Sequence, residues 1–124
     1  MVLDTCGLIW LCFEFKKLSK QTRELLLETQ VYVPSICLYE IGIKVRKKKL
    51  KIPLSVAELT ERLHKVKNLS LVSIDDRLWL ESLSLDWGHW DPVDRLVVAL
   101  AKRLKSPIVT TDREIQRFYN KILS

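Results

Sequence analysis

Short apolar segments alternate along the chain with longer stretches that are typical of helices. The short segments have the length and composition of strands and cover residues 1–3, 31–33, 69–74 and 107–111. The longer stretches cover residues 5–13, 20–28, 36–47, 56–66, 76–83, 92–104 and 113–119. Strands that are separated by helices pair in parallel, and helices cover both faces of such a sheet. The pattern therefore predicts a three-layer α/β fold with a central parallel sheet.

The clearest helix start is the sequence Asp91-Pro92-Val93-Asp94. It places a capping carboxylate before a proline at the first helical position, and a second carboxylate follows in the same turn. The stripe that this helix is expected to bury consists of Leu96, Val97, Leu100 and Leu104. Asp91 is expected to cap this helix, and a structural role is favoured for it. Asp94, which flanks the stripe, is free for another role.

The composition favours one compact domain over residues 1–124. Apolar residues make up 48% of the chain and charged residues 29%, which excludes a disordered chain or a disulfide scaffold. The formal charge is +6. Residues 44–51, which we call the basic segment, account for the whole excess, with no acid among Lys44, Arg46, Lys47, Lys48, Lys49 and Lys51. A local basic segment favours nucleic acid as a partner, although a solvated helix end is the plain alternative.

The three cysteines and the opening stretch indicate where the protein resides. Cys6, Cys12 and Cys37 are odd in number, and their spacing matches neither a redox pair nor a zinc knuckle. We interpret them as small buried residues in a reducing compartment. The apolar opening stretch has no basic leader, carries Asp4 and is too short to span a bilayer. We expect a cytoplasmic protein that has no membrane partner.

Two aspartates stand directly after predicted strands. Asp4 follows the segment 1–3, and Asp112 follows the segment 107–111. Ligands of open parallel sheets bind outside the carboxyl ends of the strands, where both side chains are expected. Each aspartate could instead cap the helix that follows it, so capping and chemistry stay open as alternatives.

Two further carboxylates are candidates for the same edge of the sheet. Glu40 lies in the apolar stripe of Ile36 and Ile43, although its spacing to Lys44 also suits a surface ion pair. Asp94 is the other. Four carboxylates that meet would repel one another unless a cation offsets their charge. A carboxylate-rich site without histidine suits Mg²⁺ or Mn²⁺, and beside a basic surface it indicates phosphodiester hydrolysis.

Four motifs occur in a fixed order that spans nearly the whole chain. They are Leu3-Asp4-Thr5, PSICLYEIGIKVRKKKLKIP, HWDPVDRLVVALA and IVTTDREI. This set resembles the PIN-domain nucleases and, among them, the VapC-type toxins of toxin–antitoxin pairs. The resemblance implies a PIN fold with four or five parallel strands and an endoribonuclease that depends on Mg²⁺ or Mn²⁺. In this family an activated water attacks phosphorus, and the products carry 5′-phosphate and 3′-hydroxyl ends.

The resemblance also implies the roles of individual residues. The family's catalytic and metal-binding acids fall on Asp4, Glu40, Asp94 and Asp112. Thr5 and Thr110 would hold the carboxylates or a metal-bound water in place, with Asp91 in a similar supporting role. The basic segment would bind RNA. Cys6 departs from the asparagine, serine or alanine that is frequent in relatives, and it could ligate a soft metal ion.

Three expectations about partners complete the resemblance. An antitoxin would lay its C-terminal segment across the acidic pocket and insert an arginine or lysine. A homodimer is expected because dimers are common in the family. We expect the four tryptophans to lie mostly in the core, with a few partly exposed ones available for a partner. The alternative function is a non-catalytic RNA-binding or antitoxin-sequestered PIN-like module.

Overall fold

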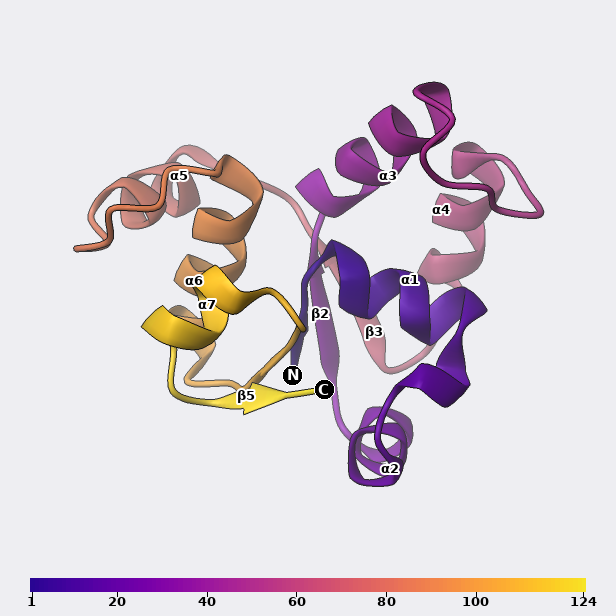
Figure 1. Ribbon diagram of the computed structural model, residues 1–124, viewed down its shortest axis with the longest axis horizontal. Helices are drawn as coiled ribbons and strands as arrows, with labels where there is room; N and C mark the ends of the chain where they lie inside the picture. Colours follow the sequence, from indigo (N-terminus) through magenta and orange to yellow (C-terminus); the bar gives the residue numbers. More distant parts are fainter.

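A central parallel sheet runs through the protein, and the computed structural model describes it over residues 1–124 (Figure 1). The strands lie in the order β3-β2-β1-β4-β5, and every neighbouring pair is parallel. Their bounds are β1 (Val2–Leu3), β2 (Val31–Pro34), β3 (Leu69–Val72), β4 (Ile108–Val109) and β5 (Ile122–Leu123). The expected sheet is confirmed in its five-stranded form.

Helices cover both faces of the sheet, as the three-layer class requires. In Figure 1, α1, α3 and α4 lie on one side of the strands, and α5, α6 and α7 lie on the other. The helices are α1 (Thr5–Phe13), the 3₁₀ turn η1 (Phe15–Lys17), α2 (Lys20–Glu28), α3 (Ile36–Arg46), α4 (Val56–His64), α5 (Asp76–Leu83), α6 (Pro92–Leu104) and α7 (Arg113–Phe118). None of them is both long enough and apolar enough to cross a bilayer.

The ends of several elements differ from the sequence prediction. Pro34 belongs to β2, where it pairs with Val72. Proline has no backbone N–H to donate, but the N–H of the next residue, Ser35, donates to the carbonyl of Val72 at 2.8 Å and continues the pairing. Ser35 precedes α3, but its side chain makes no capping hydrogen bond. The strand expected over residues 107–111 narrows to Ile108–Val109. The hydroxyl of Thr110, which follows this strand, donates to the carboxylate of Asp4 at the end of β1.

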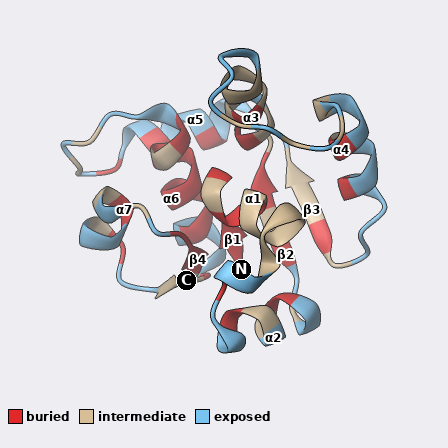
Figure 2. Cartoon of the chain, turned by 45° about the vertical axis from the view of Figure 1, so that its right-hand side comes forward, coloured by how far each residue is buried: buried red, intermediate tan, exposed pale blue.

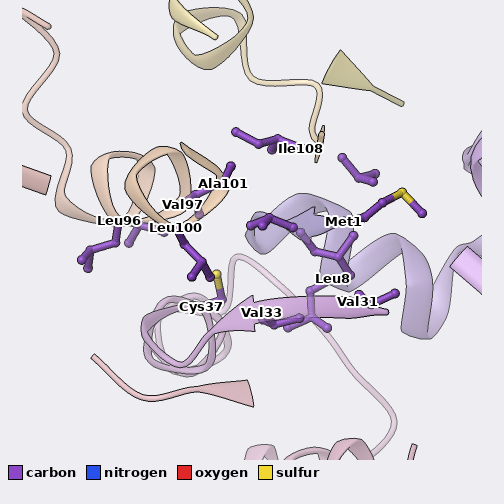
Figure 3. Close-up of a cluster of buried hydrophobic side chains, with 14 of the residues drawn as sticks. Met1, Leu8, Val31, Val33, Cys37, Leu96, Val97, Leu100, Ala101 and Ile108 are labelled. Atoms are coloured by element: carbon purple, nitrogen blue, oxygen red, sulfur yellow. The ribbon is translucent and has the colours of Figure 1, made fainter. Parts of the chain in front are cut away.

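The core forms where α6 packs across the strands. Figure 3 shows Leu96, Val97 and Leu100 of α6 among the side chains of this cluster. Figure 2 shows α6 as a largely buried helix, whereas α2 and α4 present exposed outer faces. Two of the four tryptophans, Trp10 and Trp87, pack against the core, whereas Trp79 is 41% exposed and Trp90 is 62% exposed.

The strand order places a crevice at the carboxyl ends of β1 and β4. The chain leaves β1 for β2 on one side and later returns to β4 on the other side. Such a switch point is where open α/β sheets hold their ligands, because the connecting segments diverge there. Leu3 and Val109 are register partners, so the residues after them emerge side by side.

Candidate active site

Four carboxylates line one cavity of about 160 Å³ at this crevice. Asp4 follows β1, Glu40 lies in α3, Asp94 lies in the first turn of α6, and Asp112 follows β4. The rest of the lining is Thr5, Cys6, Lys44 and Thr111. We call this the acidic cavity. The first and last of the four carboxylates lie more than a hundred residues apart in sequence, and each of the four belongs to a different element or connection.

Asp4 is fixed by hydrogen bonds to both of its oxygens. Gly7 N–H donates to Oδ1 at 2.7 Å, so Asp4 caps α1. The hydroxyl of Thr110 donates to Oδ2, and the same hydroxyl oxygen accepts from the N–H of Asp112 at 2.9 Å. Thr110 therefore joins the ends of β1 and β4 and holds two of the four acids in register.

The approach of α1 to β4 depends on Gly7. A Cβ atom at this position would lie 2.6 Å from the carbonyl oxygen of Val109 and 3.3 Å from Oδ1 of Asp4. Backbone cannot give way as a flexible side chain can, so only glycine lets the first turn of α1 pack this closely. The position of Asp4 beside the end of β4 follows from that contact.

The ionised form of Asp4 is disfavoured. Burial raises the pKa of Asp4 to about 6, and the charges of Asp112 and Glu40 push it the same way. The hydrogen bonds from Thr110 and Gly7 oppose the shift without cancelling it. A carboxylate that is 5% exposed and faces two other acids is an electrostatic cost, which a bound cation would relieve.

Asp94 has a partner that the sequence analysis did not identify. His89 Nε2 lies 2.6 Å from Asp94 Oδ2. Burial raises the pKa of Asp94 to about 6, and the charges of Asp91 and Asp112 add to this effect while the bond to His89 opposes it. The same bond raises the pKa of His89. The only sequence signal was the position of this histidine two residues before the helix cap, and spacing alone does not separate it from a surface residue.

For Asp4 and Asp112 the structure shows that capping and a place in the cavity are compatible. Asp112 accepts from Ile115 N–H at 3.0 Å and caps α7 while it lines the acidic cavity. Asp91 accepts from the N–H of Asp94 at 3.0 Å and caps α6, as expected, but does not line the cavity. The cap that Asp91 forms holds the backbone of Asp94, and the cap that Asp112 forms holds Asp112 itself at the start of α7.

The remaining side chains of the cavity come from α1 and α3. Glu40 faces Lys44 with 3.8 Å between Oε1 and Nζ, so the expected ion pair forms at the cavity wall. Cys6 lies 3.6 Å from the Thr111 hydroxyl, and burial raises the pKa of its thiol. Cys37 is buried as expected, whereas Cys6 and Cys12 are only partly buried. Cys6 is therefore a protonated thiol at the edge of an oxygen-rich cavity.

The basic segment lies at the C-terminal end of α3, on the same helix as Glu40. Lys44 reaches the acidic cavity, and the other cations of the segment are exposed to solvent: Arg46, Lys47, Lys48, Lys49 and Lys51. Lys48 adopts a left-handed conformation with φ of 58°, which turns the chain away from the helix. The segment therefore forms an exposed positive surface that begins at the cavity wall.

The donors of the acidic cavity fit a hard divalent cation. They are carboxylate and hydroxyl oxygens, which Mg²⁺ and Mn²⁺ prefer. The buried hydroxyl of Thr5 also lines the cavity and makes no hydrogen bond beyond a weak contact with the Cys37 thiol. No three histidine, cysteine, aspartate or glutamate side chains are arranged to ligate one ion as they stand. The arrangement suits an ion that keeps several waters and takes one or two carboxylates, as Mg²⁺ commonly does.

The sheet order and the acid-lined crevice define an α/β protein with an oxygen-donor site at its switch point. The model of the PIN domain family matches residues 1–121. This match covers nearly the whole chain, and the chain belongs to the PIN domain family.

Solved structures show the same fold. A chain of a structure described as a toxin-antitoxin complex from Klebsiella pneumoniae matches with a TM-score of 0.63 and 16% sequence identity. The match covers 99% of this chain and 95% of that chain. Comparison with curated protein sequences gives no significant match.

Proposed function

We propose that this protein is a Mg²⁺- or Mn²⁺-dependent endoribonuclease and acts as the toxin of a toxin–antitoxin pair. The observation that carries the proposal is the convergence of Asp4, Glu40, Asp94 and Asp112 on one small cavity at the switch point of the sheet. Membership of the PIN domain family and the fold shared with a chain of a toxin–antitoxin complex support it.

In this proposal the four carboxylates hold the ion, directly or through water. A divalent ion supplies charge for a phosphate oxygen, lowers the pKa of a water and stabilises the leaving oxygen. The protein's own contribution is to hold the acids rigidly. The Thr110 hydroxyl fixes Asp4 and also holds the N–H of Asp112, and the Thr5 hydroxyl, whose one contact is the weak one with the Cys37 thiol, would bond to a metal-bound water.

The proposed substrate is RNA, which the basic segment attracts and orients. Its exposed cations lie beyond Lys44, so a phosphate backbone that passes along the end of α3 would enter the acidic cavity past this lysine. The cavity itself carries acids and would repel phosphate without a cation. Binding and cleavage therefore fall to different parts of one surface.

The first test is cleavage of a labelled RNA with Mn²⁺ or Mg²⁺ and with a chelator. Cleavage is expected only with the ion, and Asp94→Asn should abolish it while the fold, measured by circular dichroism, is preserved. Asp86→Asn is the matched control, because Asp86 is exposed and lies outside the cavity. Metal-independent RNA binding with no cleavage would contradict the nuclease and leave the non-catalytic RNA-binding module.

The proposed protein partner is an antitoxin that places an arginine or lysine against the acids. A cationic side chain relieves the same repulsion as a metal ion, so the two should compete. Co-expression with the adjacent reading frame should yield a complex in which Mn²⁺-dependent cleavage is suppressed. A product of that frame which neither binds nor inhibits would contradict the toxin assignment.

Cytoplasmic location and a homodimer belong to the same proposal. Light scattering of the purified chain tests whether it forms the dimer.

A further inference from the structure

A single buried side chain, Arg95, fixes the segment between α5 and α6. Arg95 is 3% exposed, and its guanidinium has no carboxylate partner. It donates only to backbone carbonyls, of Ser82 at 3.0 Å, Leu83 at 3.5 Å, Leu85 at 2.8 Å, Trp87 at 2.7 Å and His89 at 2.9 Å. The segment therefore wraps around one cation.

This arrangement constrains the segment because a buried guanidinium tolerates few alternatives. Leaving its N–H groups unpaired away from water is costly, and the fork geometry fixes where the carbonyls must lie. The ring of Trp90 covers the outer side of Arg95, with 3.8 Å from Cζ to the ring centroid. The path of residues 84–91 is thus set by Arg95, although these residues form no helix or strand.

The path of this segment determines where the His89 ring lies. The imidazole lies against Trp87 with 5.0 Å between ring centroids. Trp87 in turn stacks on Phe118 of α7 at 4.6 Å with an interplanar angle of 8°. The carbonyl of His89 is held by Arg95, and its ring is held by Trp87, so both ends of the residue are fixed.

The fixed ring meets only one oxygen of Asp94. Nε2 of His89 lies 2.6 Å from Oδ2, while Oδ1 of Asp94 takes part in no hydrogen bond within the protein. A bond to one oxygen sets the plane of a carboxylate and leaves the other oxygen available. Histidine and carboxylate partners commonly orient the ligands of metal sites in this way.

We infer that His89 is a positioning residue, which orients the Asp94 carboxylate so that Oδ1 faces the acidic cavity for a divalent cation. The inference rests on the proposed function, because it assigns His89 a role towards the ion that Asp94 would bind. The geometry that carries it is the clamp of five carbonyls by Arg95, the stacked support of Trp87, and the single short contact to Asp94.

The test is the affinity of the full-length chain for Mn²⁺, measured by calorimetry at one fixed neutral pH. His89→Ala removes the contact and is expected to weaken Mn²⁺ binding by about 10-fold to 100-fold. His89→Gln places an amide nitrogen near the position of Nε2 and should restore affinity to within about threefold of the wild type. His89→Asn places its amide near the position of Nδ1, too short to reach, and should behave like alanine. Melting temperatures of the variants separate this effect from loss of fold.

The outcomes distinguish the inference from the function on which it rests. Asp94→Asn is measured in the same series and should lose Mn²⁺ binding. If Asp94→Asn binds Mn²⁺ like the wild type, the proposed metal site fails and the inference fails with it. If Asp94→Asn loses binding but His89→Ala binds Mn²⁺ as well as or more tightly than the wild type, the inference alone is overturned. Equal loss in the glutamine and alanine variants would also overturn it.

Discussion

Replacing Asp4 with asparagine should stabilise the metal-free protein at neutral pH. Burial holds the pKa of Asp4 at about 6, against about 3.8 for the same group in an unfolded chain. A difference of about two units corresponds to about 3 kcal/mol of unfolding free energy. In a chain of this size that amounts to a rise in melting temperature on the order of 10 °C.

The sign follows from which state binds the proton more tightly. Below about pH 4 the carboxyl is protonated in both states and has no effect on stability. Between about pH 4 and 6 the unfolded chain ionises first, so unfolding becomes easier as the pH rises. Above about pH 6 the folded protein carries the full cost. The advantage of Asp4→Asn should therefore grow from pH 4 to pH 7 and then level off.

The assay is thermal and urea unfolding of both proteins in chelator across this pH range, repeated with saturating Mn²⁺. The metal should reduce the difference above pH 6, since it stabilises only the wild type. Asp86→Asn removes the same charge from an exposed position and should show no comparable pH-dependent gain. A difference between Asp4→Asn and wild type that stays constant from pH 4 to pH 8 would refute the reasoning, because it would show that the charge of Asp4 is well solvated.

Three further predictions concern the frame of the site and its basic surface. Gly7→Ala should lower the unfolding free energy, measured by urea titration, by about 1 to 3 kcal/mol, because the added Cβ clashes with the Val109 carbonyl. Gly42→Ala is the control: its Cβ would meet nothing within 4 Å, so it should be neutral or stabilising in the same titration. Arg95→Lys should cost about 2 kcal/mol or more, because three ammonium donors cannot serve five carbonyls; an unchanged urea midpoint would contradict the clamp. The triple alanine variant of Lys47, Lys48 and Lys49 should weaken RNA binding and flatten its salt slope by about 2, with little change in saturated turnover, and a collapse of that turnover would reveal a catalytic or folding role instead.

The order of the elements could be predicted because local signals agree with the global fold. Asp91 forms the cap that its sequence position predicts, and Asp4 and Asp112 form the caps that the sequence left open as an alternative. The meeting of Asp4 and Asp112 at the sheet edge follows from the same logic, since the residues after parallel strands emerge at one edge. The part that these acids play in catalysis stays a prediction.

The segment between α5 and α6 could not be predicted from the sequence. It has no periodicity, and its path depends on the carbonyl contacts of Arg95, which local propensity does not encode. His89 was missed for this reason. The sequence also did not indicate which tryptophans lie outside the core: Trp90 is exposed, and its ring packs on the buried Arg95 guanidinium.

The pairing of β1 with β4 has a consequence for biosynthesis. Asp4 is synthesised well before the strand that completes its surroundings and before the Thr110 that bonds to it. A nascent chain that stalls before residue 108 lacks both β4 and Asp112, and β1 then has an open edge where the crevice should form. A chain made only up to that point therefore cannot assemble the acidic cavity, which is complete only once β4 and Asp112 have been added.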